Sequence, residues 1–397
     1  MARLAERLGI GERHLRRLFL QHLGASPIGV AQTRRALFAR QLIHETRLPL
    51  QEIAWAAGFG SVRRFNECFR KMFRQAPGAL RTRAGSAEGA KEAGVTIRIR
   101  YRPPYDWDSM LAFCAARAIP GVEVVENGRY LRTVAMGAAT GTVEVFHLPK
   151  QESLGVTIRF PEVKALPLIV ARVRRQFDTG ADIRTIEAHL TRDPVLKPLV
   201  ERRPGLRAPG SWEGFELAVR AALGQQISVA AARRLAGELV ALHGKRVSRN
   251  SALQAGLTHV FPTAKQLAAA PAVGLRMPAA RQRALQAIAR AAVADPNLFR
   301  SFGSVEPIVE RLKGIPGVGE WTAQYIALRA VREMDAFPSS DIGLLRGAAA
   351  VGCTGSNAMM LAKRAEGWRP WRGYAAQHLW AVDAAAAQGR KLVDRAA

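Results

Sequence analysis

Cysteine, acidic residues and long apolar runs are all scarce in this sequence of 397 residues. Cys68, Cys114 and Cys353 are its only cysteines, and they form no CxxC pair. A disulfide framework and a cysteine-only zinc site are therefore not expected, and free buried thiols in a reducing compartment are. No apolar run approaches the roughly 18 residues that span a bilayer. The first residues lack the apolar segment of a secretion signal, which predicts a cytoplasmic protein without a membrane partner.

The small number of acidic residues leaves a large excess of positive charge. Lys and Arg number 59 against 32 Asp and Glu, so the formal net charge is +27. Such a field attracts polyanions, with nucleic acid as the first candidate and an acidic membrane surface as the second. The first 81 residues hold 15 Lys and Arg and 5 Asp and Glu, the highest basic density in the chain. A hydrophobic content of 48% excludes wholesale disorder.

Changes in composition and periodicity predict three domains and a linker. Residues 1–81 have helical periodicity, and residues 82–95, rich in small and charged residues, are typical of a linker. Residues 96–205 combine strands with helices, and residues 206–397 are almost wholly helical with Gly and Pro punctuation. Strands are expected at 96–101, 122–126, 130–136, 141–147 and 155–160, and helical segments near 107–117 and from 166 to 199.

The N-terminal region contains two helix-turn-helix patterns, in residues 4–19 and 53–70. In each, a small helix meets a glycine, Gly9 or Gly58, and an Arg-rich helix follows. The arginines outside the apolar faces are available to a DNA major groove. They are Arg13, Arg16, Arg17, Arg63 and Arg64. The alternative is a basic helical bundle that only coats DNA or binds a protein.

The spacing of aromatic residues in the second pattern, over residues 58–81, resembles the DNA-binding domain of AraC/XylS-type regulators. The resemblance covers about residues 2–81. Domains of that family normally begin with a further helix before the one at Leu4, so we expect an incompletely packed, N-terminally truncated first subdomain. Promoter DNA is a partner that the resemblance implies.

The most specific stretch of the chain is LKGIPGVGEWTA, residues 312–323. Helical patterns flank it, and Gly314, Gly317 and Gly319 give it a bare backbone. Main-chain N–H groups at the start of the next helix can then face a DNA phosphate. An ordinary interhelix turn with a glycine cap is the alternative, but the full spacing favours a helix-hairpin-helix phosphate clamp.

A carboxylate follows this hairpin, because Asp341 lies 22 residues after Gly319. Taken alone, Asp341 would be read as a helix N-cap. A hairpin followed at this distance by a carboxylate at a helix start resembles the helix-hairpin-helix/Gly-Pro-Asp superfamily of DNA glycosylases. Residues 339–340 are Ser-Ser here, where Pro-Asp is commoner in that superfamily.

Further motifs in residues 103–118, 220–232 and 371–380 narrow the resemblance. Together they resemble 3-methyladenine DNA glycosylase II, the AlkA type, over roughly residues 96–385. The implied fold is multidomain: an all-α tandem helix-turn-helix, an α+β lobe with an antiparallel sheet, and an all-α helix-hairpin-helix glycosylase domain.

The resemblance implies hydrolysis of the N-glycosidic bond of an alkylated purine that has been flipped out of double-stranded DNA. Asp341 would stabilise the oxocarbenium-like sugar and orient or deprotonate the attacking water. A cationic base gains from electron-rich ring faces, although plain core packing is the alternative role of each aromatic residue. The candidate pocket walls are Phe113, Trp321, Tyr325 and Trp380.

A second set of positions concerns DNA insertion and reaction type. The turn at Gln225 and Gln226 is the candidate wedge, and Gln226 stands where the family has an apolar residue. Ile342 follows the aspartate at a position where the family frequently has an aromatic residue. Trp321 occupies the position of the Schiff-base lysine of bifunctional relatives, which predicts a monofunctional enzyme without lyase activity. No metal or organic cofactor is expected, and the resemblance implies a monovalent cation between the hairpin carbonyls and a phosphate.

Three functions are compatible with at least some of these features. The first is a monomeric, nucleoid-associated glycosylase for alkylated double-stranded DNA, fused to a regulator-type domain. The second is a regulator of an alkylation response whose glycosylase part is a non-catalytic damage sensor. A chromatin-coating protein, the third, explains the charge but not the motif order. Asp341 and the intact hairpin favour the enzyme. Related fusions carry a zinc-held methyl-accepting cysteine, and no such cysteine cluster occurs here, so activation by that route is not expected.

Overall fold

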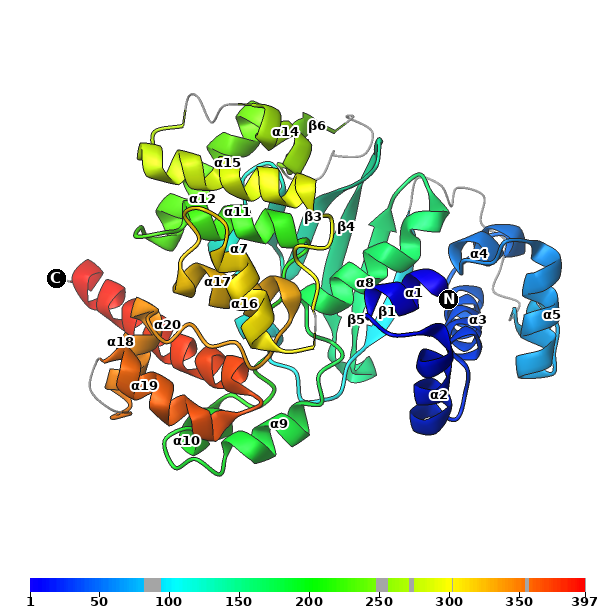
Figure 1. Cartoon of the computed structure of the whole chain (residues 1–397), viewed down its shortest axis with the longest axis horizontal. Helices are drawn as coiled ribbons and strands as arrows, with labels where there is room; N and C mark the ends of the chain where they lie inside the picture. The colour runs from blue at the N-terminus through cyan, green and yellow to red at the C-terminus, as the bar shows by residue number, and fades with distance from the viewer. Residues whose placement is uncertain (82–93, 248–255, 271–274, 302, 354–356, 397) are drawn as a thin grey trace. The chain divides into compact units, whose positions relative to one another are not determined.

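The computed structural model describes residues 1–81, 94–247, 256–270, 275–301, 303–353 and 357–396, except for the side chains of residues 3, 7 and 388–396. Most of the predicted linker, 82–95, lies outside the described residues, and the predicted domain boundaries stay a prediction. The chain forms two compact units (Figure 1). The first contains Met1–Arg98, Ala135–Glu144 and Gly155–Val170, and the second contains Ile99–Val134, Val145–Leu154 and Ala171–Ala397.

The first unit begins with the two predicted helix-turn-helix patterns, and both are confirmed. Gly9 and Gly58, with φ angles of 64° and 80°, make the turns in the left-handed region that glycine adopts without strain. The elements are α1 (Ala2–Arg7), α2 (Glu12–Leu23), α3 (Pro27–Glu45), α4 (Leu50–Ala56), α5 (Val62–Phe73) and the 3₁₀ turn η1 (Pro77–Leu80).

Aromatic packing explains why α5 turns one face inward. Phe65 and Phe69 are fully buried, and their ring centroids lie 5.5 Å apart. The hydroxyl of Ser61 accepts a hydrogen bond from the backbone N–H of Arg64 at 3.2 Å and so caps the start of the helix. Because Phe65 and Phe69 fix the buried face, Arg63 and Arg64 are left exposed at the first turn.

A five-stranded sheet has the strand order β1-β5-β4-β3-β2. All five predicted strands are confirmed within two residues at each end. Asn127 and Gly128 both have positive φ in the hairpin between β2 and β3, which suits the right-handed twist of paired strands. The strands are β1 (Val95–Arg100), β2 (Glu123–Glu126), β3 (Arg129–Met136), β4 (Ala139–Leu148) and β5 (Ser153–Arg159).

The rest of the chain is mainly helical, as predicted from residue 212 onward. The predicted helical region 166–199 is divided by turns into three helices, α8 (Leu166–Gln176), α9 (Ile183–Leu190) and α10 (Lys197–Arg202). The other helices are α7 (Trp107–Arg117), α11 (Gly214–Leu223), α12 (Val229–His243), α14 (Ala264–Ala269), α15 (Ala279–Ala294), α16 (Val305–Lys313), α17 (Glu320–Ile326), α18 (Ile342–Ala350), α19 (Ala358–Ala365) and α20 (Arg372–Ala396). The shorter elements are β6 (Lys245–Arg246), β7 (His259–Val260), the 3₁₀ turns η2 (Pro149–Gln151), η3 (Val163–Ala165) and η5 (Glu366–Trp368), and the π-helical turn η4 (Ala327–Val331).

Two apolar cores hold the helices of the second unit. One gathers buried residues of α11, α12 and α15–α17, among them Ile288 and Leu312. The other gathers residues of α9 and α18–α20, among them Leu344 and Leu379. Within the described residues, no helix is both long enough and apolar enough to cross a membrane.

None of the three cysteines, all of which lie in described residues, forms a disulfide. Cys114 and Cys353 are buried, and burial raises the pKa of the Cys114 thiol to about 12. Cys68 is only half-buried, so the expected burial holds for two of the three.

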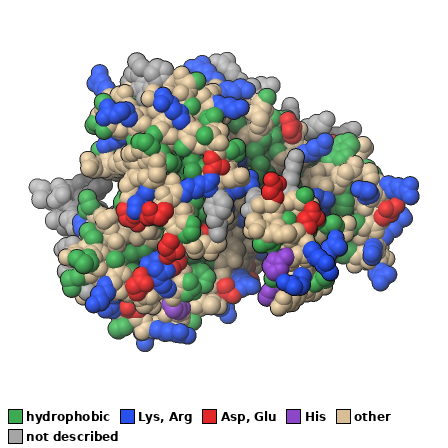
Figure 2. All heavy atoms as spheres, in the orientation of Figure 1, with side chains coloured by type: hydrophobic (Ala, Val, Ile, Leu, Met, Phe, Trp, Pro, Cys, Tyr) green, Lys and Arg blue, Asp and Glu red, His purple; other side chains and the backbone are tan. Residues whose placement is uncertain are grey.

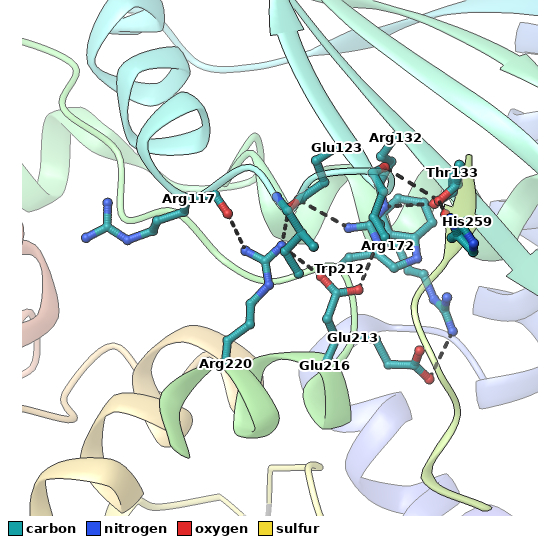
Figure 3. A network of polar contacts seen from close by, with 12 residues as sticks. Arg117, Glu123, Arg132, Thr133, Arg172, Trp212, Glu213, Glu216, Arg220 and His259 are labelled. Atoms are coloured by element: carbon teal, nitrogen blue, oxygen red, sulfur yellow. Dashed lines mark hydrogen bonds and ion pairs between the residues drawn. The ribbon is translucent and has the colours of Figure 1, made fainter. Parts of the chain in front are cut away.

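A network of buried charges joins α11 to the sheet (Figure 3). Arg132 on β3 donates to Glu216 on α11 at 2.8 Å, and its guanidinium lies 3.7 Å from Glu123. Arg220, one turn after Glu216, pairs with Glu216 at 3.2 Å and with Glu123, and donates to the carbonyl of Arg117 at the end of α7 at 3.2 Å. Burial acts to raise the pKa of Glu123, but Arg220 and Arg132 outweigh it and hold that pKa below its ordinary value.

Removing one charge from this network should destabilise the protein strongly. Glu216→Gln leaves the buried Arg132 and the half-buried Arg220 with a single carboxylate, so we expect the free energy of unfolding to fall by about 3–5 kcal/mol. Glu213→Gln is the matched control, because Glu213 pairs with Arg172 at 3.5 Å but is 55% exposed, and the expected loss is about 1 kcal/mol or less. Urea unfolding followed by tryptophan fluorescence measures both, and equal losses would contradict the assignment.

Candidate active site

The carboxylate of Asp341 is held by three N–H donors. Its Oδ1 accepts from the backbone of Leu344 at 2.9 Å, and Asp341 is therefore the N-cap of α18. The indole Nε1 of Trp380 on α20 also donates to Oδ1, at 2.8 Å. The indole Nε1 of Trp321 on α17 donates to Oδ2, at 2.8 Å. The N-cap reading is correct, and the same side chain also joins α17, α18 and α20.

The structure brings all four predicted aromatic side chains into one neighbourhood. Trp321 and Tyr325, one turn apart on α17, stack with ring centroids 5.5 Å apart at 14°. Tyr325 meets Trp380 edge to face at 6.4 Å. Phe113 of α7 is connected to them through the guanidinium of Arg329, which lies 4.9 Å from the centroid of Phe113 and 4.9 Å from that of Trp380. The four rings are half-buried rather than fully enclosed, so they are not ordinary core residues.

In the hairpin between α16 and α17, one position requires glycine because of its backbone conformation and its close neighbour. Gly317 has a φ of +85°, and a Cβ there would lie 2.5 Å from the Cβ of Ala284. Gly319, the N-cap of α17, has no atom within 4 Å of the position of a Cβ, so its backbone is open. Gly314 ends α16, and its N–H is occupied by the carbonyl of Glu310 at 3.1 Å.

The two glutamines of the predicted wedge differ in their exposure and in their contacts. Gln225 is half-buried, and its side-chain amide donates to the carbonyl of Gly317 at 3.0 Å and to the hydroxyl of Thr322 at 3.1 Å. Gln226 is exposed and has a φ of 57°, so the backbone leaves the helical conformation there. Arg281 of α15 donates to the carbonyl of Gln225 at 2.6 Å. Gln225 thus braces the turn against the hairpin, and Gln226 is the exposed member.

The predicted DNA-contacting arginines of the first unit are all exposed, and two are partnered. Arg63 pairs with Glu67 at 2.9 Å, and the guanidinium of Arg17 lies 2.9 Å from the ring Nδ1 of His14. Arg13, Arg16 and Arg64 are also exposed. Figure 2 shows Lys and Arg side chains, in blue, spread over the visible face with Asp and Glu among them.

In the described part of the chain, no three His, Cys, Asp or Glu side chains lie close enough together to hold a metal ion.

Comparison with known proteins agrees with this geometry. Residues 96–213 match the model of the AlkA N-terminal domain, and residues 4–83 match that of a helix-turn-helix domain. A relative from Mycobacterium tuberculosis, named "Probable bifunctional transcriptional activator/DNA repair enzyme AlkA", is 38% identical over 95% of this chain and 75% of its own length. The chain belongs to this AlkA family.

Other members share only part of the chain. The DNA-3-methyladenine glycosylase 2 of Escherichia coli is 34% identical over 71% of this chain and 95% of its own length. The structure of a 3-methyladenine DNA-glycosylase from Archaeoglobus fulgidus covers 72% of this chain and 97% of its own with a TM-score of 0.63. At 22% identity that likeness shows the fold, which is the predicted α+β lobe followed by a helical glycosylase domain.

The candidate site of this AlkA family member also contains two arginines that the sequence motifs do not indicate. They are Arg281, which supports the Gln225 turn, and Arg329, which contacts three of the aromatic rings. A signal for Arg329 was present, because a single arginine interrupts the apolar stretch at residues 326–331. An arginine is almost never fully buried unless it is paired, so an arginine inside an apolar helix indicates a specific role.

Gly317 and Gly319 should differ in their tolerance of alanine. Gly317→Ala forces a Cβ against Ala284 and a strained φ, so we expect the free energy of unfolding to fall by about 1–3 kcal/mol. Gly319→Ala, with an ordinary φ and open space, should change it by about 0.5 kcal/mol or less. Thermal unfolding of both variants tests this, and a tolerant Gly317 would contradict the hairpin geometry.

Proposed function

We propose that this chain is a DNA glycosylase that hydrolyses the N-glycosidic bond of alkylated purines in double-stranded DNA. The observation that carries the proposal is the carboxylate of Asp341, fixed by two indole N–H groups beside half-buried aromatic rings. The names of the relatives supply the reaction, since they include DNA-3-methyladenine glycosylase 2 and a bifunctional transcriptional activator and DNA repair enzyme.

The chemistry follows from the charge of the damaged base. Alkylation of a ring nitrogen makes the purine cationic, so it leaves with the electron pair of the C1′–N bond and departs neutral. The sugar then carries positive charge, which the Asp341 carboxylate stabilises. A carboxylate has about four lone-pair positions, and three N–H donors occupy only part of them, so an oxygen can also orient or deprotonate the attacking water.

The reaction is expected to stop at base release. A lyase of this superfamily needs an amine that attacks the sugar, and Trp321 stands at the corresponding position. Lys313, the lysine of the hairpin motif, is paired with Glu310 at 2.9 Å and with Glu320 at 3.0 Å. We therefore assign this chain a monofunctional mechanism.

The DNA contacts are assigned from the loops beside the site. Gln226, exposed at the turn after α11, is proposed to fill the gap left by the flipped base. The open backbone at Gly319 is proposed to face a phosphate, with a monovalent cation at the hairpin carbonyls as in the family it resembles. No other cofactor enters the proposed reaction, and a monomer suffices for it.

Replacing the carboxylate should slow base release strongly while retaining the cap of α18. Asn caps helices as well as Asp does, so Asp341→Asn retains the cap of α18. We expect release of 3-methyladenine from methylated duplex DNA to slow by about 10²-fold or more. Intact chain and variant are compared by chromatography of the free base.

Three results of this experiment would count against the proposal or a part of it. Equal release by both proteins would remove Asp341 from the mechanism. Strand breaks formed by the intact protein without heat or alkali would contradict the monofunctional assignment. No release by either protein, with DNA binding retained, would favour the non-catalytic damage sensor instead.

The helix-turn-helix domain is proposed to bind promoter DNA through α2 and α5. Its exposed arginines supply the electrostatic contacts, and the Mycobacterium tuberculosis relative is named a transcriptional activator.

Arg64 gives a test of this DNA contact in the full chain. Arg64→Ala should weaken binding to undamaged duplex DNA and reduce the slope of log affinity against log salt by about 1. Glu67→Gln should act in the opposite direction, because it releases Arg63 from its ion pair. Fluorescence anisotropy at several salt concentrations measures both, and unchanged slopes would exclude α5 from the DNA interface.

A further inference from the structure

Arg329 is a buried charge close to the proposed active site. It lies in the π-helical turn η4, which continues directly from α17, and only 2% of the residue is exposed. Its Nη1 donates to the carbonyl of Pro209 at 2.9 Å, and its Nη2 donates to the side-chain oxygen of Gln377 at 2.8 Å. These neutral acceptors hold the guanidinium in one orientation.

The charge of Arg329 is not cancelled by an acid. Among the described residues, no carboxylate forms an ion pair with it, and its buried Nε–H meets no acceptor. Burial lowers the pKa of Arg329 to about 10, which still leaves it a cation at neutral pH. Buried arginines are ordinarily paired, since an isolated charge in a low-dielectric interior is costly.

Aromatic rings surround the guanidinium instead. Its Cζ lies 4.9 Å from the ring centroids of both Phe113 and Trp380, and 5.7 Å from that of Tyr325. These are three of the four rings proposed to hold the damaged base. Cation–π attraction offsets part of the burial cost. The wider turn of a π-helix, a feature frequent at functional sites, sets the position of this side chain.

A fixed positive charge here acts differently on two classes of purine. A cationic alkylated purine is repelled when it binds, and it leaves as a neutral molecule. A neutral purine takes the electron pair of the C1′–N bond and gains negative charge as it leaves, while water adds to C1′ and its proton passes to Asp341 or solvent. A nearby guanidinium stabilises that negative charge.

We propose that Arg329 is a specificity-determining residue that favours neutral purines over cationic ones in the excision reaction. This inference rests on the proposed glycosylase function and adds the substrate class to it. Two unit charges about 10 Å apart in a protein environment change a rate by on the order of tenfold. The ratio of release rates for a neutral and a cationic purine is therefore the quantity that reports on Arg329.

The test uses two duplexes with one modified base each, hypoxanthine as the neutral purine and 7-methylguanine as the cationic one. Single-turnover release is measured at enzyme concentrations too low to saturate the duplex, so that the rate constant includes binding of the base. The full chain is compared with Arg329→Met, which removes the charge and keeps apolar volume. Gln377→Glu is the sharper variant, because it leaves Arg329 in place and sets a carboxylate against its Nη2. We expect both variants to lower the neutral-to-cationic ratio by about tenfold.

Two controls separate charge from structure. Gln377→Met changes the same position without adding a charge, so its ratio should stay that of the parent. Arg329→Lys retains the charge and should retain most of the ratio. Should Arg329→Met fail to fold, which circular dichroism reveals, the pair of Gln377 variants still decides the question.

The outcomes distinguish this inference from the function on which it rests. A neutral-to-cationic ratio that falls in Gln377→Glu but not in Gln377→Met supports the inference. Equal slowing on both duplexes in Gln377→Glu and Gln377→Met overturns it, because Arg329 would then serve packing alone. Release of neither purine by the parent chain, with 3-methyladenine still released, also overturns it, whereas release of none of the three bases defeats the proposed function itself.

Discussion

The convergence of two indole N–H groups on one carboxylate is the constraint on which this site depends. Asp341 begins α18, but its oxygens are shared with Trp321 of α17 and Trp380 of α20. Three helices therefore have to be in place before the carboxylate has its geometry. Because α17 also begins at the hairpin glycine Gly319, one short helix carries both the end of the hairpin and the Trp321 donor to this carboxylate. A displacement of the hairpin would therefore also move Trp321 and alter its hydrogen bond to Asp341.

A second set of interactions ties this arrangement to the α+β lobe. The carbonyl of Arg117 and the carboxylate of Glu123 hold Arg220, and α11 ends at Leu223, just before the Gln225 turn. The helix that contains Arg117 also supplies Phe113 to the aromatic group. The lobe that matches the AlkA N-terminal domain is therefore part of the site rather than a neighbour of it.

The sequence predicted the elements well and the orientation of side chains poorly. Hydrophobic alternation located five strands, and the glycines at 9 and 58 located two turns, because both depend on local backbone physics. The aspartate and its aromatic companions were found as members of a motif. Their hydrogen bonds were not, because the indole N–H of Trp380 reaches Asp341 only through the tertiary packing of α18 on α20.

Gln225 shows the same limit. Its place in a motif marked it together with Gln226, but nothing in the sequence tells which of two adjacent amides turns inward toward Gly317. If the chain acts as proposed, the inward orientation of Gln225 affects how it finds damaged bases. With the turn already braced against the hairpin, the protein loses little conformational freedom when it meets DNA. The barrier to capture then lies in the duplex, so base pairs that are weakly stacked or weakly paired are sampled first.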